Sequence, residues 1–236
     1  MKYIFLILVF LAAISCHEDT VTNQYNYEDQ LSVSLIIRSN QIKQTAFITR
    51  VKPFEADPGP ASFVDSVILN VDNRLFEWIP SDSMGDNQNC WQSVIDVRKC
   101  FNYYTDSLLV LAGKSYKLLA SYKTKTIEGF TDVPGDFNIA VKGRTISWTK
   151  SENAYLYRIT GIHLEGGNFI IERVTTDSSL TINEESFDPG PYRITVEALD
   201  KNFYDLAFDR TYAAGLSGAV GVFGSVTVKT IEAKIE

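Results

Sequence analysis

The chain has 236 residues, of which 45% are hydrophobic and 12% aromatic, so it is long and apolar enough to bury a substantial core. Its 29 acidic and 22 basic residues give a formal net charge of −7. An acidic chain without a basic stripe argues against nucleic acid as a partner, and against adhesion to anionic lipid through a basic patch.

The first fifteen residues have the pattern of a removable export signal. Lys2 is a short basic segment, and residues 4–14 form an unbroken apolar run. This run is too short to span a bilayer as a helix, which takes about 20 residues. It ends in Ala13-Ile14-Ser15-Cys16, which resembles the lipobox of bacterial lipoproteins, where small residues precede a cysteine that receives lipid.

The resemblance implies cleavage after residue 15 and acylation of Cys16, with residues 16–30 as a polar lipidated tether. The alternative is an ordinary secretory signal with a cysteine nearby. Removal of Lys2 with the signal would take the net charge from −7 to −8. An acidic pair, Glu18-Asp19, follows the cysteine closely and resembles the export signal of Bacteroidetes surface lipoproteins. The expected location is therefore the outer membrane, lipid-anchored at the cell surface. If the pair is only a plain polar tether, the protein would face the periplasm.

Two cysteines, Cys90 and Cys100, remain besides Cys16. In an oxidising compartment two remaining cysteines favour a disulfide. Such a bond would close a short loop and stabilise the folded state by about 3 kcal/mol. Free buried thiols and a metal pair are the alternatives, although His17 and His163 are the only histidines available as further ligands. We expect no metal and no cofactor.

The mature chain reads as β almost throughout, with short runs of Val, Ile, Thr, Tyr and Phe between Gly, Pro, Asn and Asp turns. A first domain is expected over 31–133, as an Ig-like or transthyretin-like sandwich, and Asp72-Asn73 is a hairpin turn within it. Its predicted strands are 31–38, 45–51, 64–71, 74–79, 92–97, 107–110, 115–122 and 126–132. The Pro and Gly of Val133-Pro134-Gly135-Asp136 then predict a domain boundary.

Residues 137–236 resemble a fibronectin type III domain. Ile146 and Trp148 would share one face of its second strand, and Tyr155, Tyr157 and Ile159 one face of the third. The run Phe187-Asp-Pro-Gly-Pro-Tyr192 resembles the turn into the sixth strand, where a tyrosine bonds back to the backbone. Residues Tyr192, Ile194, Val196 and Ala198 would face inward, and 225–232 would be the last strand.

The whole chain resembles a family of Bacteroidetes outer-membrane lipoproteins known only as a domain of unknown function. The resemblance is carried by the lipobox, a Gly113-Lys-Ser-Tyr116 strand start, the Val133-Pro134 boundary and a closing Gly221-Val-Phe-Gly224-Ser. It implies a surface location and a possible link to nutrient uptake, but no catalytic residues.

The most informative segment is 200–224, which would join the last two strands as a loop of unusual length. It contains Phe203, Tyr204, Phe208 and Tyr212 as candidate ligand or partner residues, and glycines at 215, 218, 221 and 224 that would permit tight turns. Its aromatic residues either cover the seam between the sandwiches or are presented to a ligand such as a sugar ring.

Catalytic chemistry is not indicated. His163 is the only histidine in the expected folded part, no serine lies in a G-x-S-x-G elbow, and acid pairs such as Glu184-Glu185 look like solvated loop residues. Asp200, Asn202 and Asp205 could offer oxygens to calcium but lack the EF-hand pattern. The sequence therefore predicts a non-catalytic surface lipoprotein that acts in binding or assembly, accessory to an outer-membrane transport or adhesion system. A free-standing glycan-binding lipoprotein is the main alternative, and a hydrolase a weaker one.

Overall fold

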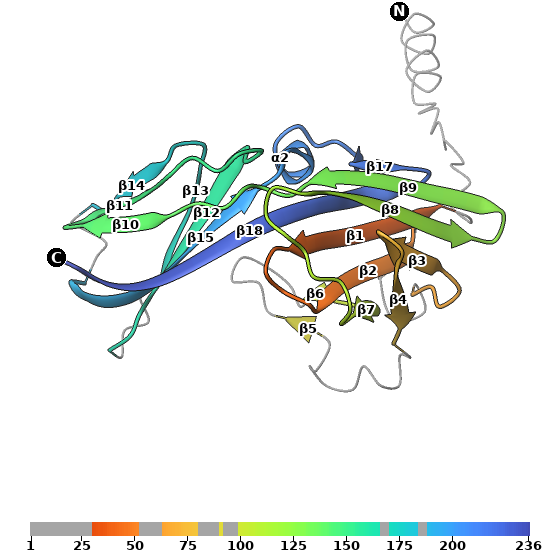
Figure 1. Ribbon diagram of the computed structural model, residues 1–236, viewed down its shortest axis with the longest axis horizontal. Coiled ribbons are helices and arrows are strands. Elements are labelled where there is room, and N and C mark those ends of the chain that lie inside the picture. Colours follow the sequence, from red (N-terminus) through yellow and green to blue (C-terminus); the bar gives the residue numbers. More distant parts are fainter. Residues whose placement is uncertain (1–29, 52–62, 80–89, 92–98, 166–169, 184–187) are drawn as a thin grey trace, which may run out of the picture.

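The computed structural model describes residues 30–51, 63–79, 90–91, 99–165, 170–183 and 188–236, and these are all-β apart from one short helix (Figure 1). The expected fold class is confirmed. The signal, the tether, the predicted strand 92–97 and the acid pair Glu184-Glu185 lie outside the described residues. Within the part of the chain that is described, no helix has the length and apolar character needed to cross a membrane.

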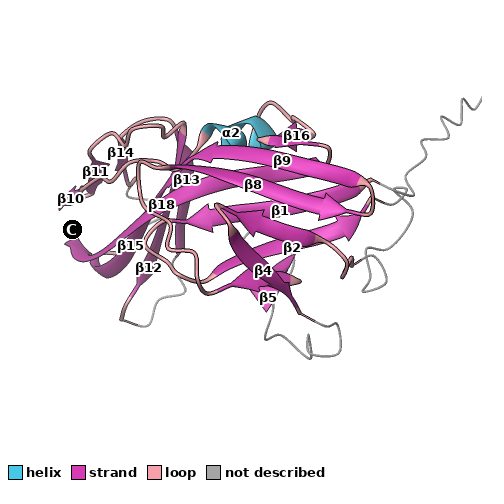
Figure 2. Ribbon diagram, turned by 45° about the vertical axis from the view of Figure 1, so that its right-hand side comes forward, coloured by secondary structure: helices cyan, strands magenta, loops and turns pink. Residues whose placement is uncertain are grey.

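The first sandwich is a sheet that folds over on itself. Its main strands are β1 (Leu31–Arg38), β2 (Gln44–Arg50), β3 (Ile68–Val71), β4 (Arg74–Trp78), β7 (Tyr103–Thr105), β8 (Ser115–Tyr122) and β9 (Lys125–Asp132). They follow the order β1-β2-β7-β4-β3-β8-β9, so β8 and β9 run alongside β1 and β2 as a second layer (Figure 2). A separate ribbon pairs β5 (Cys90–Trp91) with β6 (Lys99–Cys100).

Alternation of apolar and polar residues places the core between these layers. Along β1, Leu31, Val33, Leu35 and Ile37 are buried, whereas the residues between them are more exposed. Strands β2, β3, β8 and β9 add apolar residues to the same core. The Asp72-Asn73 turn is as predicted, since both residues have positive φ, the geometry of a type I′ hairpin turn.

Two predicted strands of the first sandwich differ from the structure. The run 64–71 forms a strand only from Ile68, and 107–110 forms none. Leu108 and Val110 are nevertheless buried, and the hydroxyl of Tyr116 accepts a hydrogen bond from the Leu111 backbone N–H at 2.8 Å. The apolar residues that suggested a strand are therefore the buried residues of an irregular segment.

The second sandwich has the two-sheet arrangement of a fibronectin type III domain. Its strands are β10 (Ile139–Lys142), β11 (Thr145–Trp148), β12 (Leu156–His163), β13 (Ile170–Thr175), β14 (Ser179–Thr181), β15 (Gly190–Leu199) and β18 (Val220–Ile235). One sheet has the order β10-β11-β14 and the other β13-β12-β15-β18. Ile146, Trp148, Ile194 and Val196 are buried between them, as predicted, and the Tyr192 hydroxyl donates to the Asp188 carbonyl at 2.7 Å.

Strand β18 belongs to both sandwiches. Residues 220–226 pair in parallel with β1, from Ser32↔Val220 to Arg38↔Val226. From Val226 to Ile235 the same strand pairs antiparallel with β15. The last strand therefore begins at 220 rather than at the predicted 225, and the two sandwiches are joined by one continuous strand (Figure 1).

The segment 200–224 is not the long loop that the sequence suggested. It contains helix α2 (Lys201–Ala207), the short strands β16 (Ala213–Ala214) and β17 (Leu216–Ser217), and the start of β18. β17 pairs with β9, and β16 with β18, so most of the segment is part of the first sandwich. Gly221 has φ +106, and a Cβ there would lie 2.1 Å from the Val33 carbonyl oxygen. Because Gly221 has no side chain, β18 can lie against β1 at this position.

Candidate functional site

Helix α2 lies where the two sandwiches meet, and local hydrogen bonds fix its position. Asp200 is the N-cap, with its carboxylate accepting from the Phe203 backbone N–H at 2.9 Å. The Asn202 amide donates to the carbonyls of Phe130 and Phe223 at 2.7 and 2.8 Å. A short helix of this kind is marginal by itself, so these contacts with β9 and β18 hold it in place.

The four aromatic residues predicted in this segment have different surroundings. Phe203 and Tyr204 are partly buried and pack on a small apolar cluster of Leu156, Leu199 and Val226 at the junction. Phe208 is 53% exposed and Tyr212 is 85% exposed. The segment therefore covers the seam with its first aromatic residues and presents the later ones to solvent.

A fifth aromatic residue, Tyr155, joins this group. Its ring centroid lies 6.4 Å from that of Tyr204, and Tyr204 stacks on Phe208 at 5.1 Å with an interplanar angle of 21°. We call Tyr155, Tyr204 and Phe208 the aromatic ledge. No ring contact places Tyr212 in it among the described residues.

The expectation that Tyr155 shares one face of the third strand with Tyr157 and Ile159 is wrong. Tyr155 is 49% exposed, whereas Tyr157 and Ile159 are buried. Strand β12 begins only at Leu156, which is buried at the junction. Tyr155 precedes the strand and so escapes its alternation. The turn residues Asn153-Ala154 just before it are the sequence signal that could have indicated this.

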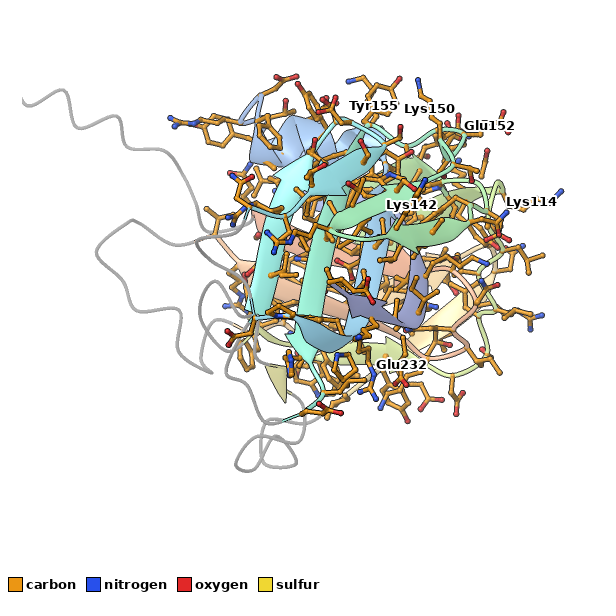
Figure 3. The ribbon with its side chains drawn as sticks, turned by 90° about the vertical axis from the view of Figure 1, so that its left-hand side faces the viewer. Lys114, Lys142, Lys150, Glu152, Tyr155 and Glu232 are labelled. Carbon is orange, nitrogen blue, oxygen red and sulfur yellow. The ribbon has the colours of Figure 1, made fainter. Side chains whose placement is uncertain are left out.

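An open pocket of about 620 Å³ lies beside the ledge, and Tyr155 is one of its walls. The lining residues are Lys150, Ser151, Glu152, Asn153, Ala154, Tyr155, Tyr157 and Thr176. Figure 3 shows Lys150, Glu152 and Tyr155 next to one another along one edge of the molecule.

Buried hydrogen bonds hold the turn that forms this pocket. Ser151 is buried, and its hydroxyl donates to the Gly135 carbonyl at 2.6 Å. Its backbone N–H donates to the Tyr157 hydroxyl at 2.8 Å. Asn153 has φ +59, which closes the turn. The pocket is thus preformed on a rigid base, while Lys150, Glu152 and Thr176 at its rim remain exposed.

The charges around the ledge are balanced. Lys201 contacts both carboxylate oxygens of Asp205 at 2.6 Å, and this hydrogen bond raises the pKa of Lys201. Lys150 and Glu152 supply one charge of each sign at the pocket rim. The site therefore has no strong preference for an anion or a cation.

Beneath α2, Asp200 is part of a buried polar network. Its carboxylate accepts from the Thr131 hydroxyl at 2.5 Å and lies 3.2 Å from the Ser225 hydroxyl. Burial raises the pKa of Asp200, although these hydrogen bonds oppose the shift. Because Thr131 belongs to β9 and Ser225 to β18, the network fastens the end of β15 to the first sandwich.

The side chains considered as calcium ligands do not converge. Asp200 is occupied by its cap and hydroxyl partners, Asn202 by two carbonyls, and Asp205 by Lys201. Across the described residues, no group of three or more His, Cys, Asp or Glu side chains is placed to hold a metal ion. His163 lies at the end of β12 with its ring against Tyr192, at 4.8 Å between centroids.

Cys90 and Cys100 are directly opposite each other in the antiparallel β5–β6 ribbon. The Cα atoms of such a pair are about 4.5–5.5 Å apart, a separation that a disulfide can bridge. The disulfide remains a prediction, now supported by the backbone register.

Comparison with known proteins assigns no family to this chain. No protein-family model matches the chain, and no curated protein matches it. One similar solved structure, described as a cytokine receptor complex, is 12% identical over 85% of this chain and 95% of the other, with a TM-score of 0.31. Another, fibronectin domains FN1–FN3 of chicken CNTN1, is 14% identical over 87% of this chain and 64% of the other, with a TM-score of 0.27. At these TM-scores neither likeness carries an argument about this chain.

Proposed function

We propose that this protein is a lipid-anchored surface protein that acts by binding or assembly rather than catalysis, as an accessory to an outer-membrane transport or adhesion system. The observation that carries the proposal is the shared strand β18. A strand that pairs with β1 and then with β15 connects the sandwiches directly, and in the other connection, between β9 and β10, the Gly135 N–H donates to the Glu152 carbonyl. The two therefore form one rigid body, which is suited to holding a binding surface in a fixed place.

The direction of β1 determines how the protein would be oriented on the proposed anchor at Cys16. The register places Leu31 at the end of the first sandwich remote from the second, and Arg38 at the junction (Figure 1). A tether that enters at Leu31 would attach the first sandwich to the membrane and direct the second away from it. The aromatic ledge and pocket would then lie beyond the first sandwich, accessible to a ligand.

The exposed rings of the ledge support binding. Aromatic side chains provide large contact areas at low entropic cost, and they are enriched in binding surfaces. Tyr155 and Phe208 are each about half exposed, and both rings contact Tyr204, which packs on the apolar cluster at the junction. An acylated protein with such a surface is suited to capture a ligand or to dock on a membrane partner.

The anchor is tested by membrane flotation of the full-length protein and its Cys16→Ala variant. The wild type should float with the membrane fraction, and the variant should remain in the soluble fraction. Protease added to intact cells then reports the face of the outer membrane, since a surface protein is cleaved and a periplasmic one is protected. A Cys16→Ala protein that still floats would contradict lipid anchoring.

The accessory role is tested by affinity isolation of the lipoprotein from gently solubilised outer membrane, with mass spectrometry of the proteins that accompany it. A stoichiometric outer-membrane transporter or adhesion protein is the expected result. Isolation of the protein alone, as a monomer, would contradict the accessory role and favour the second candidate, a free-standing glycan-binding lipoprotein. The pocket beside Tyr155 is the observation that favours this second candidate.

A further inference from the structure

We infer that the pocket beside the aromatic ledge is a binding site for a neutral saccharide, with Tyr155 as the ring on which a sugar stacks. The inference rests on the proposed binding function and names the class of ligand. It joins two neighbouring features, the pocket formed by the turn after β11 and the ledge formed with α2, through the one residue common to both.

The shape of the site fits a small ligand. A pocket of about 620 Å³ is within the range of small-molecule sites, about 300–1,000 Å³. A stable protein–protein contact takes about 800 Å² from each partner, which is a larger and flatter area than this turn offers. The preformed turn at Ser151 means that a ligand would not have to order it.

The chemistry of the site fits a sugar. One face of a pyranose ring carries C–H groups that are attracted to the electron-rich face of an aromatic ring, and its hydroxyls both donate and accept hydrogen bonds. Tyr155 supplies the ring, since it is half exposed and lines the pocket. Lys150, Glu152 and Thr176 supply donors and acceptors at the rim. An aromatic ligand would use the ring but not this mixed polar rim.

The balanced charge favours a neutral ligand. Lys150 and Glu152 contribute one positive and one negative charge at the rim, and Lys201 is paired with Asp205. A polyanion or a phosphate would need an excess of cations here, which these pairs do not provide. Tyr204 and Phe208 act as positioning residues, because their stack supports the Tyr155 ring from the side of α2.

The test is electrophoresis of the full-length lipoprotein, kept in detergent, through gels that contain β-glucan, xylan, α-mannan, galactan or starch. A protein that binds the polysaccharide migrates more slowly in that gel. Tyr155→Ala is compared with Tyr155→Phe, which keeps the ring, and with Tyr212→Ala, which removes an aromatic residue that is 85% exposed and lies outside the ledge. Calorimetric titration with oligosaccharides of the retarding polymer gives the affinities. Thermal unfolding of each variant confirms that it is folded.

At least one of these polysaccharides should retard the wild type. Tyr155→Ala should weaken the affinity by about tenfold, the upper range for loss of one ring contact. Tyr155→Phe and Tyr212→Ala should keep most of it. Retardation by none of the five polymers, or affinity unchanged in Tyr155→Ala, would overturn the inference.

Isolation of Tyr155→Ala from outer membrane separates this inference from the proposed function. A membrane partner that is retained while no polysaccharide binds would leave the accessory role standing and overturn the saccharide site. The saccharide site would also be overturned if the wild type binds no polysaccharide and Tyr155→Ala loses the membrane partner. That result would assign the aromatic ledge to a protein contact.

Discussion

Arg38 and Glu197 join the two sandwiches through an ion pair, with Nη1 of Arg38 lying 3.1 Å from Oε1 of Glu197. Arg38 ends β1, and Glu197 lies on β15 of the second sandwich. The other carboxylate oxygen of Glu197 pairs with Arg158 on β12. Since the Glu197 side chain is only 10% exposed, its charge is held between two guanidinium groups at the junction.

We expect Glu197→Ala to lower the free energy of unfolding by about 1–3 kcal/mol, because it leaves two partly buried arginines without their shared carboxylate. The matched control is Glu232→Ala, which removes the exposed pair with Arg193 on the same sandwich. The control should cost less than about 1 kcal/mol. Denaturant unfolding measures both, and equal costs would show that the junction pair has no special role.

Gly221→Ala should lower the free energy of unfolding more than an alanine substitution at a glycine with open space around it. The added Cβ would meet the Val33 carbonyl oxygen at 2.1 Å, and φ is +106. We expect a loss of more than about 2 kcal/mol, because β18 would have to move away from β1. Gly143→Ala is the control, since it also has positive φ but has nothing within 4 Å of the new Cβ. It should cost about 1 kcal/mol, and a similar value for Gly221→Ala would contradict the close approach.

We expect the buried carboxyl of Asp200 to make the free energy of unfolding decrease as pH rises. Its pKa is raised in the folded protein by burial, so the native state binds this proton more readily than the unfolded state. The stabilisation that Asp200 contributes is therefore fully present below the pKa of this group in the unfolded chain. It is lost as pH rises through the raised pKa in the folded protein.

Asp200→Asn isolates this effect. The amide oxygen can still cap α2 at Phe203, and the amide nitrogen can donate to the Thr131 and Ser225 hydroxyls. Urea unfolding from about pH 4 to about pH 8 should show the wild type losing stability relative to the variant as pH rises. A difference in the free energy of unfolding that stays constant with pH, or a wild type that gains stability as pH rises, would show that burial does not raise the pKa of Asp200.

The disulfide is checked by mass spectrometry. Protein treated with an alkylating agent without reduction should carry no label on Cys90 or Cys100, and reduction should expose both to labelling. The backbone register that places them opposite each other is the reason for this expectation. Labelling of both cysteines without reduction would contradict it.

The sequence predicted the β class, the inward residues of β15 and the turn at Asp72-Asn73, because these depend on local alternation and turn chemistry. It did not predict that β18 pairs with β1. That pairing is parallel and joins residues almost two hundred positions apart, so no local pattern records it. The sequence does not indicate the exposed position of Tyr155 for a related reason, since that position depends on where β12 begins against β15.

The segment 200–224 was predicted in part. The sequence indicates its unusual aromatic residues and glycines but not α2, because a short helix lacks a readable period and depends on the Asp200 cap and the contacts of Asn202. The glycines at 215, 218 and 221 do adopt positive φ, as their role in tight turns requires.

The two sandwiches act as one rigid unit because β18 completes both. Scanning calorimetry of the full-length lipoprotein in detergent tests this most directly. We predict a single unfolding transition whose calorimetric enthalpy equals its van't Hoff enthalpy, since neither sandwich can keep its last strand if the other unfolds. Two separate transitions would show that the sandwiches unfold independently, and would contradict the rigid body on which the proposed function rests.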